Sequence, residues 1–387
     1  MVNSRPIQAT IHVEALRHNL MRVQLANAAS GDARVWAVVK ANAYGHRVEH
    51  AYAGLRGADG FACLDLSEAA SLRSLGWRGP ILLLEGAFNA RDLEFCSRLN
   101  LWHVIHCEAQ IDWLAAHKTN EPQRVFLKLN SGMNRLGFKP EQYRAAYARL
   151  TALSQVAEVS HLTHFSDADS DTTTGMGKMS GQWQTFQAAT QDLDGESSLA
   201  NSAAALRQSA PHGDWSGGDW VRAGVALYGA APDYPAKSSS DWDLQPAMTL
   251  SSRMVSVQHL DKGDGVGYGS AFVADRPMRI GTVACGYADG YPRHVSSAPK
   301  GAPVLVDGQR TYTLGRISMD MLAVDLTHLP NSGLGSRVTL WGRADPLQAG
   351  SAVLPIDEVA AAAGTISYEL MCAVAARVPF VVDTGEI

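Results

Sequence analysis

The pattern of apolar and polar positions changes once along the chain. From residue 35 to about residue 229, short and nearly continuous apolar runs alternate with polar segments of helical composition. Continuous runs are typical of strands buried on both faces, and helical spacers are typical of the crossovers in a parallel sheet. We count eight runs: VWAVV, DGFACLD, PILLLEG, LWHVIH, RVFLKLN, VSHLTHF, SSLANS and VRAGVALYG.

Eight such units predict an α/β fold whose strands close into a (β/α)8 barrel of the TIM type. The alternative is an open, doubly wound sheet. A dinucleotide-binding sheet of that kind carries Gly-x-Gly-x-x-Gly after its first strand, whereas this chain has AVVKANAYGH there. We therefore favour the closed barrel.

Beyond the barrel the sequence becomes rich in strands. The Pro-, Ser- and Asp-rich stretch APDYPAKSSSDWDLQP marks a boundary, and runs such as MTLSSRMVSVQHL and PVLVDGQRTYTLG follow it. Asp307 and Gly308 predict a two-residue hairpin turn. We expect the barrel over residues 1–238 and a mainly β domain over residues 239–387, with about the first ten residues pairing with the second domain.

Composition narrows the class of partner. The chain has 387 residues, 46% hydrophobic content, a formal net charge of −5 and no dense run of Lys and Arg. These values disfavour nucleic acid and a membrane surface and favour a small molecule. Because the N-terminus lacks an apolar signal region, we expect a cytoplasmic protein. Five cysteines without a Cys-x-x-Cys pair predict reduced core thiols and no metal site.

Residues that end the predicted strands are candidates for chemistry, because a barrel of this type assembles its site at the carboxyl ends of its strands. Gathering many charged groups is costly unless they are paired or bind something. The excess of cations indicates an anionic ligand such as a phosphate. The candidates are Lys40, Asp65, Glu85, His106, Lys128 with Arg135, His164, Ser202 and Arg222.

Each candidate also has a purely structural interpretation. Lys40 is either a solvated lysine or an amine whose pKa is lowered by a dry, cationic site, able to form a Schiff base with an aldehyde. His164 is either a hydrogen-bonded core histidine or a site residue. Arg222 lies inside an apolar strand and therefore needs an acceptor.

Three loops of the second domain and one segment near its end are also candidates. GDGVGYGSAF contains Tyr268, GYADGYPR contains Tyr287, GRISMDMLAVDL contains Met319 and Asp320, and TISYEL contains Tyr368. Taken singly, these segments are typical of tight Gly/Asp turns or of a helix start. Their significance depends on their occurring together.

Together, these motifs resemble those of the alanine racemases, which are pyridoxal phosphate (PLP) enzymes of fold type III. AVVKANAYGH is similar to the family's cofactor-lysine motif, and THFSDAD, NSAA, VRAGVALYG, GYGSAF, GYADGYPR, SMDM and SYEL follow in the family's order. The resemblance covers essentially the whole chain. It implies a PLP-binding barrel, a β domain and a homodimer whose sites combine both subunits.

The resemblance also implies how PLP is held. Lys40 is the Schiff-base lysine, and Arg222 faces the pyridine nitrogen with His164 as its neighbour. A phosphate site after the last two strands is usual in such barrels. The residues implied for the phosphate are Tyr44, Ser202, Gly224, Val225 and Tyr368.

For the substrate, the resemblance implies that Arg135 lies near the cofactor phenolate and the substrate carboxylate. Met319 offers a backbone contact to that carboxylate, and Asp320 supports its loop. Lys128 matches a lysine that is carbamylated in some relatives. The residues implied for an access corridor are Asp169, Tyr287, Arg293, Arg316 and Ile366.

Racemisation needs two bases, because inverting a carbon requires proton removal on one face and delivery on the other. The resemblance implies that Lys40 and Tyr268 are those bases, with Tyr268 coming from the opposite subunit. Tyr268 would take the α-proton of L-alanine, and Lys40 that of D-alanine. Such an isomerase supplies D-alanine for peptidoglycan or serves alanine catabolism.

Other functions stay open at this point. One is a broader-specificity amino acid racemase, and another is a non-catalytic PLP-binding regulator, whose relatives have no counterpart to Tyr268. A decarboxylase of the same fold type and a cofactor-free Schiff-base aldolase are further rivals. Two positions depart from the family's pattern, with Arg47 replacing a glycine and Asn130 an aspartate. Both leave substrate breadth open.

Overall fold

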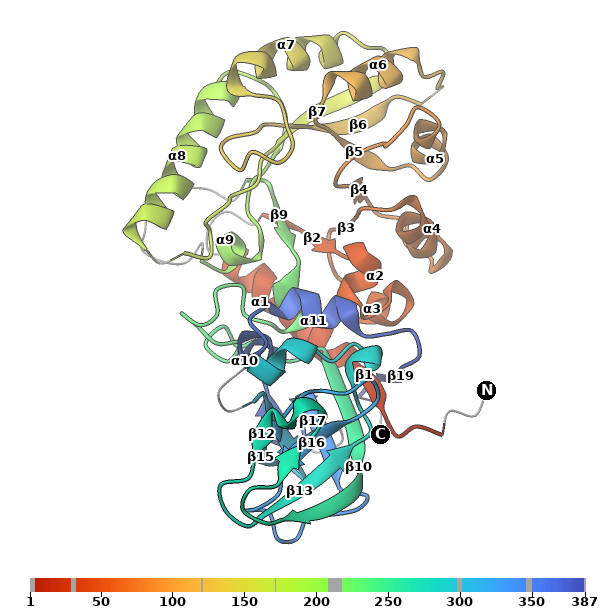
Figure 1. The fold of residues 1–387 in the computed structure, drawn as a ribbon. Helices are drawn as coiled ribbons and strands as arrows, with labels where there is room; N and C mark the ends of the chain where they lie inside the picture. The colour runs from red at the N-terminus through yellow and green to blue at the C-terminus, as the bar shows by residue number, and fades with distance from the viewer. Residues whose placement is uncertain are drawn as a thin grey trace.

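A closed barrel of eight parallel strands forms the first part of the chain (Figure 1). The computed structural model describes residues 4–28, 33–119, 121–170, 172–207, 218–297, 301–345 and 350–385. Neighbours in the barrel follow the chain order, and β9 returns to pair with β2, so the predicted (β/α)8 barrel is confirmed. The strands are β2 (Arg34–Val38), β3 (Gly60–Cys63), β4 (Ile81–Leu83), β5 (Trp102–Ile105), β6 (Gln123–Lys128), β7 (Val156–Leu162), β8 (Ser197–Ser198) and β9 (Trp220–Ala223).

Helices connect the barrel strands and lie around their outer side (Figure 1). This alternation is what the polar segments between the apolar runs predict. The helices are α1 (Val13–Ala28), α2 (Lys40–Tyr44), α3 (Val48–Leu55), α4 (Leu66–Ser74), α5 (Asp92–Arg98), α6 (Glu108–Ala116), α7 (Pro140–Thr151), α8 (Thr173–Thr190) and α9 (Ser202–Arg207), with the short 3-10 helix η1 (Val225–Tyr228) after β9.

Large aromatic side chains fill the barrel interior. Trp36 of β2 stacks on Trp220 of β9 with ring centroids 4.0 Å apart, and Trp102 of β5 meets Trp36 edge-on at 5.5 Å. These rings are buried, and aromatic side chains remove a large apolar area from water. The interior is therefore a packed core, and a ligand site is expected beyond the strand ends.

The second part of the chain is a nine-stranded sheet that also includes the first strand of the chain. β1 (Gln8–His12) pairs antiparallel with β10 and parallel with β19, so the red and blue ends of the chain lie side by side in Figure 1. The other strands of the sheet are β10 (Met248–Leu260), β13 (Met278–Val283), β14 (Pro303–Val306), β15 (Gln309–Leu314), β16 (Leu322–Asp325), β17 (Arg337–Arg343), β18 (Val353–Leu354) and β19 (Phe380–Asp383).

Shorter elements complete the β domain. The strands β11 (Gly265–Val266) and β12 (Phe272–Val273) form a separate hairpin. The predicted turn at Asp307 and Gly308 is confirmed, because β14 and β15 pair across it and both turn residues have positive φ. The remaining elements are η2 (Tyr268–Ser270), η3 (Tyr287–Asp289), η4 (Arg293–Ser297), α10 (Ile356–Ala362) and α11 (Ser367–Ala373).

α10 and α11 lie between the barrel and the sheet (Figure 1), and α11 packs against the α2 segment. α11 also carries Cys372, which is exposed. The expectation that all five cysteines are core thiols is therefore wrong for Cys372, and Cys107 is only half-buried. Cys63, Cys96 and Cys285 are buried as expected.

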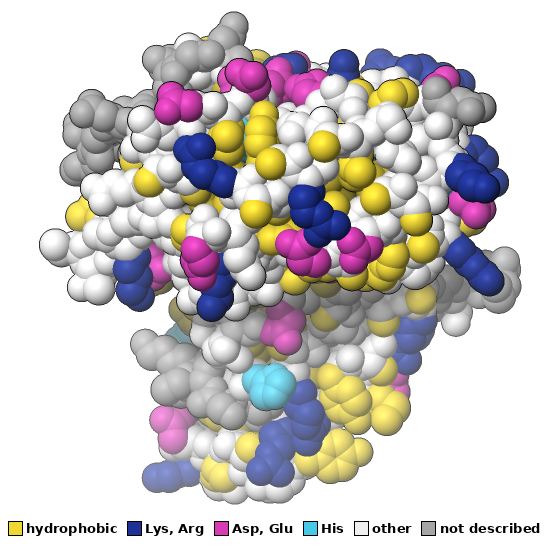
Figure 2. All heavy atoms as spheres, turned by 90° about the horizontal axis from the view of Figure 1, so that it is seen from above, with side chains coloured by type: hydrophobic (Ala, Val, Ile, Leu, Met, Phe, Trp, Pro, Cys, Tyr) yellow, Lys and Arg dark blue, Asp and Glu magenta, His cyan; other side chains and the backbone are white. Residues whose placement is uncertain are grey.

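Charged groups of both signs are mixed on the barrel face seen in Figure 2, and that face has no large patch of one sign. Within the described ranges, no helix combines the length and the apolar character that crossing a membrane requires. The same ranges contain no group of three or more His, Cys, Asp or Glu side chains arranged to hold a metal ion.

Buried histidines give the barrel a pH-dependent stability. His103 of β5 is fully buried, and its Nε2 lies 2.7 Å from Gln123 Oε1. Burial lowers the pKa of His103 to about 4. Because the folded pKa lies below the ordinary 6.5, the unfolded state binds the extra proton first.

We therefore expect the contribution of His103 to be fully present above pH 6.5 and to be lost as the pH falls toward 4. The free energy of unfolding should fall by up to about 1.4 kcal/mol per pH unit for this group. Urea unfolding at several pH values gives the free energy of unfolding as a function of pH. Between pH 4 and 6.5, this free energy should change less steeply with pH for His103→Asn than for the unchanged protein. Equal slopes would contradict the assignment.

Candidate active site

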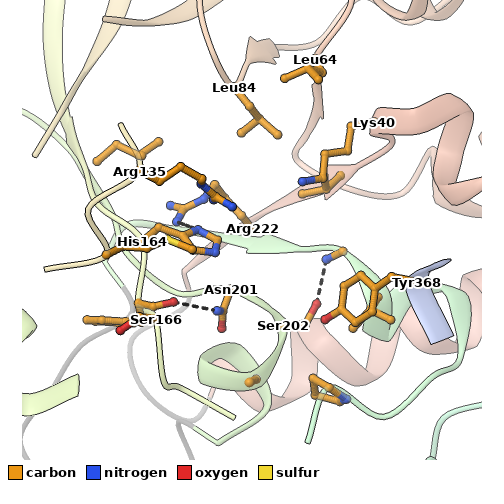
Figure 3. A pocket seen from close by; sticks show the side chains of 18 of the residues that line it. Lys40, Leu64, Leu84, Arg135, His164, Ser166, Asn201, Ser202, Arg222 and Tyr368 are labelled. Atoms are coloured by element: carbon orange, nitrogen blue, oxygen red, sulfur yellow. Dashed lines mark hydrogen bonds between the residues drawn. The ribbon is translucent and has the colours of Figure 1, made fainter. Parts of the chain in front are cut away.

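A cavity of about 390 Å³ lies at the carboxyl end of the barrel (Figure 3). Most of the predicted strand-end residues line it: Lys40, Glu85, Lys128, Arg135, His164, Ser202 and Arg222. Residues placed there by the family resemblance line it as well: Tyr44, Asp169, Gly224, Val225 and Tyr368. The strand-end rule therefore brings together residues that are far apart in the sequence.

Two strand-end candidates do not line this cavity. Asp65 caps α4, where its Oδ1 accepts the N–H of Ser67 at 2.7 Å. His106 follows β5, and its backbone N–H donates to Oε1 of Gln110 at 2.8 Å. Both residues therefore make local contacts with the helix that follows their strand, Asp65 through its side chain and His106 through its backbone.

A turn of left-handed backbone follows β2 and sets the position of Lys40. Ala41, Asn42, Ala43 and Tyr44 have φ values from 51° to 56°, and Gly45 follows at 77°. This turn is the segment drawn as α2 in Figure 1. Left-handed backbone costs roughly 1–2 kcal/mol for each residue with a Cβ, so neighbouring elements must hold the turn in place.

Glu68 of α4 is one of the groups that hold it. Its Oε1 accepts the N–H of Asn42 at 2.8 Å, while its Oε2 accepts the N–H groups of Leu64 and Asp65. The side chain of Asn42 in turn accepts the N–H of Val48 at 2.9 Å. The first residues after Lys40 are thus tied both to the end of β3 and to the start of α3.

The end of the turn is held by close packing. A Cβ at Gly45 would overlap the backbone carbonyl of Met371 in α11, so only glycine fits there. The Tyr44 ring stacks on Tyr228 of η1 with centroids 4.7 Å apart. The hydroxyl of Tyr228 donates to the carbonyl of Val38 in β2 at 2.9 Å. These contacts place the hydroxyl end of Tyr44 at the cavity.

Cations dominate the electrostatics of the cavity. Burial, then Arg135 and Arg222, lower the pKa of Lys40, although the carboxylate of Glu85 acts in the opposite direction. Burial and the same two arginines lower the pKa of Lys128 to about 8. A lysine with a lowered pKa has a larger neutral fraction at pH 7, and a neutral amine is a nucleophile and a base.

Arg222 of β9 is buried and held by four acceptors. Its Nη1 donates to Ser198 Oγ at 2.6 Å, and its Nη2 reaches the carbonyls of Thr163 and Leu199 and the Nδ1 of His164 at 3.2 Å. Within the described residues these bonds leave Nε of Arg222 without a protein acceptor. Burial and Arg222 lower the pKa of His164 well below its usual value, so His164 accepts this bond as a neutral ring.

Hydroxyl and amide donors gather at the other end of the cavity. Ser202 Oγ accepts the N–H of Gly224 at 2.8 Å and that of Ala226 at 3.4 Å, which leaves its own proton to donate (Figure 3). Burial raises the pKa of Tyr44 and of Tyr368, so both phenols stay protonated donors. A Cβ at Gly224 would overlap the Tyr44 hydroxyl, which shows how closely these groups approach.

These residues fit PLP as a ligand. A phosphate needs several donors, and the cluster around Ser202 provides them. A pyridine nitrogen needs one donor, which Nε of Arg222 can supply, and an aldehyde needs the amine of Lys40. The fit rests on the chemistry of the donor set and on the close approach of Gly224 to Tyr44.

A second group of predicted residues lies in the β domain and does not line the cavity. Tyr268 of η2 is 68% exposed, and Gly269 beside it packs against the guanidinium of Arg316. Arg293 lies over the ring of Tyr287 at 5.5 Å and donates to the carbonyl of Ile317 at 2.6 Å. Met319 is 54% exposed.

Two further predicted residues are Ile366 and Asp320, and Asp320 directly follows Met319 in the sequence. Ile366 is 60% exposed at the start of α11, two positions before Tyr368, which lines the cavity. Asp320 accepts a hydrogen bond from Arg377 at 2.6 Å. Of the two departures from the family pattern, Arg47 stacks over Phe380 of β19 at 4.1 Å, and Asn130 caps its own loop through Gly132 and Asn134.

Sequence reasoning missed some residues that shape this site. Glu68 could have been found, because Asp65-Leu66-Ser67-Glu68 is a helix-capping signature. Its additional bond to Asn42 had no sequence signal. Neither did Asp289, whose buried carboxylate meets Arg5 and Arg377 from opposite ends of the chain.

Fold and site together define a class: a barrel enzyme with a buried, cation-flanked lysine and a phosphate-type donor cluster, joined to a β domain. Comparison with known proteins narrows the class. The family model for the alanine racemase N-terminal domain matches residues 11–232, and that for the C-terminal domain matches residues 247–382.

Whole proteins match over almost the whole chain. An alanine racemase of Acidovorax sp. (strain JS42) is 65% identical over 98% of this chain and 99% of its own length. The alanine racemase of Delftia acidovorans is 64% identical over 98% of this chain and 100% of its own length. The crystal structure of the biosynthetic alanine racemase from Pseudomonas aeruginosa superimposes with a TM-score of 0.88 at 42% identity, covering 98% of this chain and 99% of that one. The chain belongs to the alanine racemase family, which confirms the predicted resemblance.

Gly45→Ala tests the left-handed turn. The substitution should lower the free energy of unfolding by at least about 2 kcal/mol, because backbone strain is added to the overlap with Met371. Urea unfolding measures this loss. Gly76→Ala is the matched control, since Gly76 has φ of 98° but open space around its Cβ position. If both variants lose the same amount, packing against α11 does not hold the turn.

Proposed function

We propose that this protein interconverts L-alanine and D-alanine with PLP as its cofactor, at sites that two copies of the chain complete together. The observation that carries the proposal is the separation of the two predicted bases. Lys40 lines the barrel cavity, whereas Tyr268 lies on an exposed face of the β domain. Membership in the alanine racemase family supports the substrate.

The barrel residues bind the cofactor. When bound, PLP supplies an electron sink that makes the α-proton of an attached amino acid more acidic. Lys40 would hold the aldehyde group through its amine, and Arg222, oriented by His164, would donate a hydrogen bond to the pyridine nitrogen. Tyr44, Ser202, Tyr368 and the backbone of Gly224 and Val225 would hold the phosphate.

Arg222 limits how far charge is withdrawn from the reacting carbon. Although burial lowers its pKa to about 9, the guanidinium keeps its proton at neutral pH and donates without protonating its partner. Negative charge that develops at the α-carbon of a bound amino acid would then be less stabilised, and that carbon would be reprotonated quickly. This favours inversion over transamination.

Lys40 and Tyr268 move the proton on opposite faces of the α-carbon. The lowered pKa of Lys40 lets its amine act as a base at neutral pH. Tyr268 comes from the second copy of the chain and takes the α-proton of L-alanine, whereas Lys40 takes that of D-alanine.

Arg135 and Met319 hold the substrate carboxylate, the first through its guanidinium and the second through its backbone. Lys128 supports Arg135. Since its pKa is lowered to about 8, part of its amine is neutral at pH 7 and can add carbon dioxide with loss of one proton. The resulting carbamate would pair with Arg135 and reverse the charge at that position.

Access to the site passes along Asp169, Tyr287, Arg293, Arg316 and Ile366. Asp169 belongs to the cavity wall, while the other residues are exposed. We place the reaction in the cytoplasm, where D-alanine serves peptidoglycan synthesis or L-alanine enters catabolism. An apolar pocket discriminates against each extra methylene by only about 1–3 kcal/mol, so slow turnover of slightly larger amino acids is expected.

Mixed dimers test the shared site. Lys40→Ala should remove both lysine-bound PLP, detected by borohydride reduction and peptide mass spectrometry, and racemisation. Tyr268→Phe should also be inactive as a racemase. A dimer purified through two tags, with one change on each chain, should recover about half of the unchanged activity, because one of its two sites then has both bases.

Two results would contradict this proposal. If Lys40→Ala retains borohydride-reducible PLP on another lysine, the cofactor lysine is wrong. If the mixed dimers are no more active than either parent variant, Lys40 and Tyr268 do not meet across two chains. Reassembled dimers of unchanged chains, carried through the same tags, are the control for losses during mixing.

A further inference from the structure

Asp289 of η3, in the β domain, has a side chain with no exposed surface. Its Oδ2 accepts from Arg5 at 3.0 Å and from the N–H of Gly286 at 2.9 Å, and its Oδ1 accepts from Nε of Arg377 at 2.7 Å. A buried carboxylate is unfavourable unless its charge is paired and its oxygens are hydrogen-bonded. Here both conditions are met by segments near the two ends of the chain.

Both arginines continue from Asp289 to the same neighbouring loop. Nη2 of Arg377 donates to Oδ1 of Asp320 at 2.6 Å, and Nη2 of Arg5 donates to the backbone carbonyl of Asp320 at 3.2 Å. Asp320 directly follows Met319 in the sequence. The charge of Asp289 is thus connected through two side chains to the residue next to Met319.

The backbone makes the same connection. The N–H of Tyr287 donates to the carbonyl of Ser318 at 3.1 Å, and the N–H of Ala288 donates to the carbonyl of Met319 at 3.0 Å. A Cβ at Gly286 would overlap both carbonyls, so the η3 turn and this loop are in close contact. With the carbonyls facing η3, the amide N–H of Met319 has no protein acceptor within the described residues.

We propose that Asp289 is a positioning residue for substrate binding. It fixes η3 and, through Arg5 and Arg377, the loop that presents the Met319 backbone to the carboxylate of the amino acid in the other subunit's barrel. The inference rests on the proposed function, because Met319 does not line the cavity of its own chain. Asp289 would thus act on the site of the other subunit, without contacting the reacting atoms.

The geometry favours this role over a purely structural one. Met319 is 54% exposed and the Asp320 side chain is 42% exposed, so the contacts that hold this loop are those with η3 and with the two arginines. A binding amide must nevertheless be held within a fraction of an ångström of its productive position. The hydrogen bonds from Arg5 and Arg377, both anchored on Asp289, supply that constraint.

Asp289→Asn tests the proposal, because it removes the charge while keeping the shape. We expect KM for L-alanine to rise about tenfold, since the misplaced loop weakens a hydrogen bond to a charged group, with kcat changed by less than about threefold. A merely structural role would lower the amount of active enzyme, and therefore kcat, at unchanged KM. Such a result would overturn the proposal.

The control is Asp383→Asn, in the same domain. Asp383 accepts a bond from His12 at 2.8 Å and from the N–H of Gly385 at 3.0 Å, and it contacts neither loop. It should lower stability and leave KM unchanged. If Asp289→Asn does not fold, Arg377→Gln replaces it, because Arg377 is 40% exposed. That variant should raise KM in the same way, and an unchanged KM would overturn the proposal.

Mixed dimers show in which subunit Asp289 acts. When a Lys40→Ala chain is paired with an Asp289→Asn chain, the only site with Lys40 faces an intact β domain of the other chain. We expect the KM of the unchanged enzyme. A raised KM in an active mixed dimer would mean that Asp289 acts on the site of its own chain, and it would overturn the role in trans without affecting the proposal of a shared site. If Lys40→Ala and Tyr268→Phe chains also fail to complement, the shared site and this role fall together.

Discussion

The structure depends on the left-handed turn that follows β2. The strand β2 ends at Val38, and the segment after Lys40 does not continue as an ordinary right-handed helix. Four residues with side chains adopt positive φ instead, at a cost of roughly 1–2 kcal/mol each. Glu68, the Tyr44–Tyr228 stack and the close approach of Gly45 to α11 hold them there. The turn held in this way brings Lys40 and Tyr44 to the same cavity.

Electrostatics then determines what the cavity can do. Lys40, Lys128, Arg135 and Arg222 share it with the carboxylate of Glu85, so the uncharged forms of the lysines are favoured and an anionic ligand is attracted. The same excess of positive charge that lowers the pKa of an amine also stabilises a phosphate. Among the described residues that line this cavity, the β domain contributes Tyr368 of α11, while Tyr268 and Met319 lie exposed elsewhere in that domain.

Much of the fold could be predicted because the apolar runs of the strands and the residues of the hairpin turn are local patterns in the sequence. Continuous apolar runs define buried parallel strands, and Asp307-Gly308 defines a hairpin. The strand-end rule found Arg222 and His164, but it failed for Asp65, since helix capping competes for the same position. The sequence ANAY gives no sign of left-handed backbone. Asp289 is linked to Arg5, 284 positions away, and to Arg377, 88 positions away, and no local pattern encodes either contact.

Racemisation by two bases can be measured directly by incubating the PLP-loaded protein with L-alanine in heavy water. Optical rotation and α-deuterium, read by NMR, are followed in the same sample. Rotation should decay to zero while deuterium appears at the α-carbon of both enantiomers, because each inversion passes the proton through a base that exchanges with solvent. Deuterium uptake without loss of rotation would mean that a single base acts and that Tyr268 has been misassigned. No change in either signal would contradict alanine as the substrate.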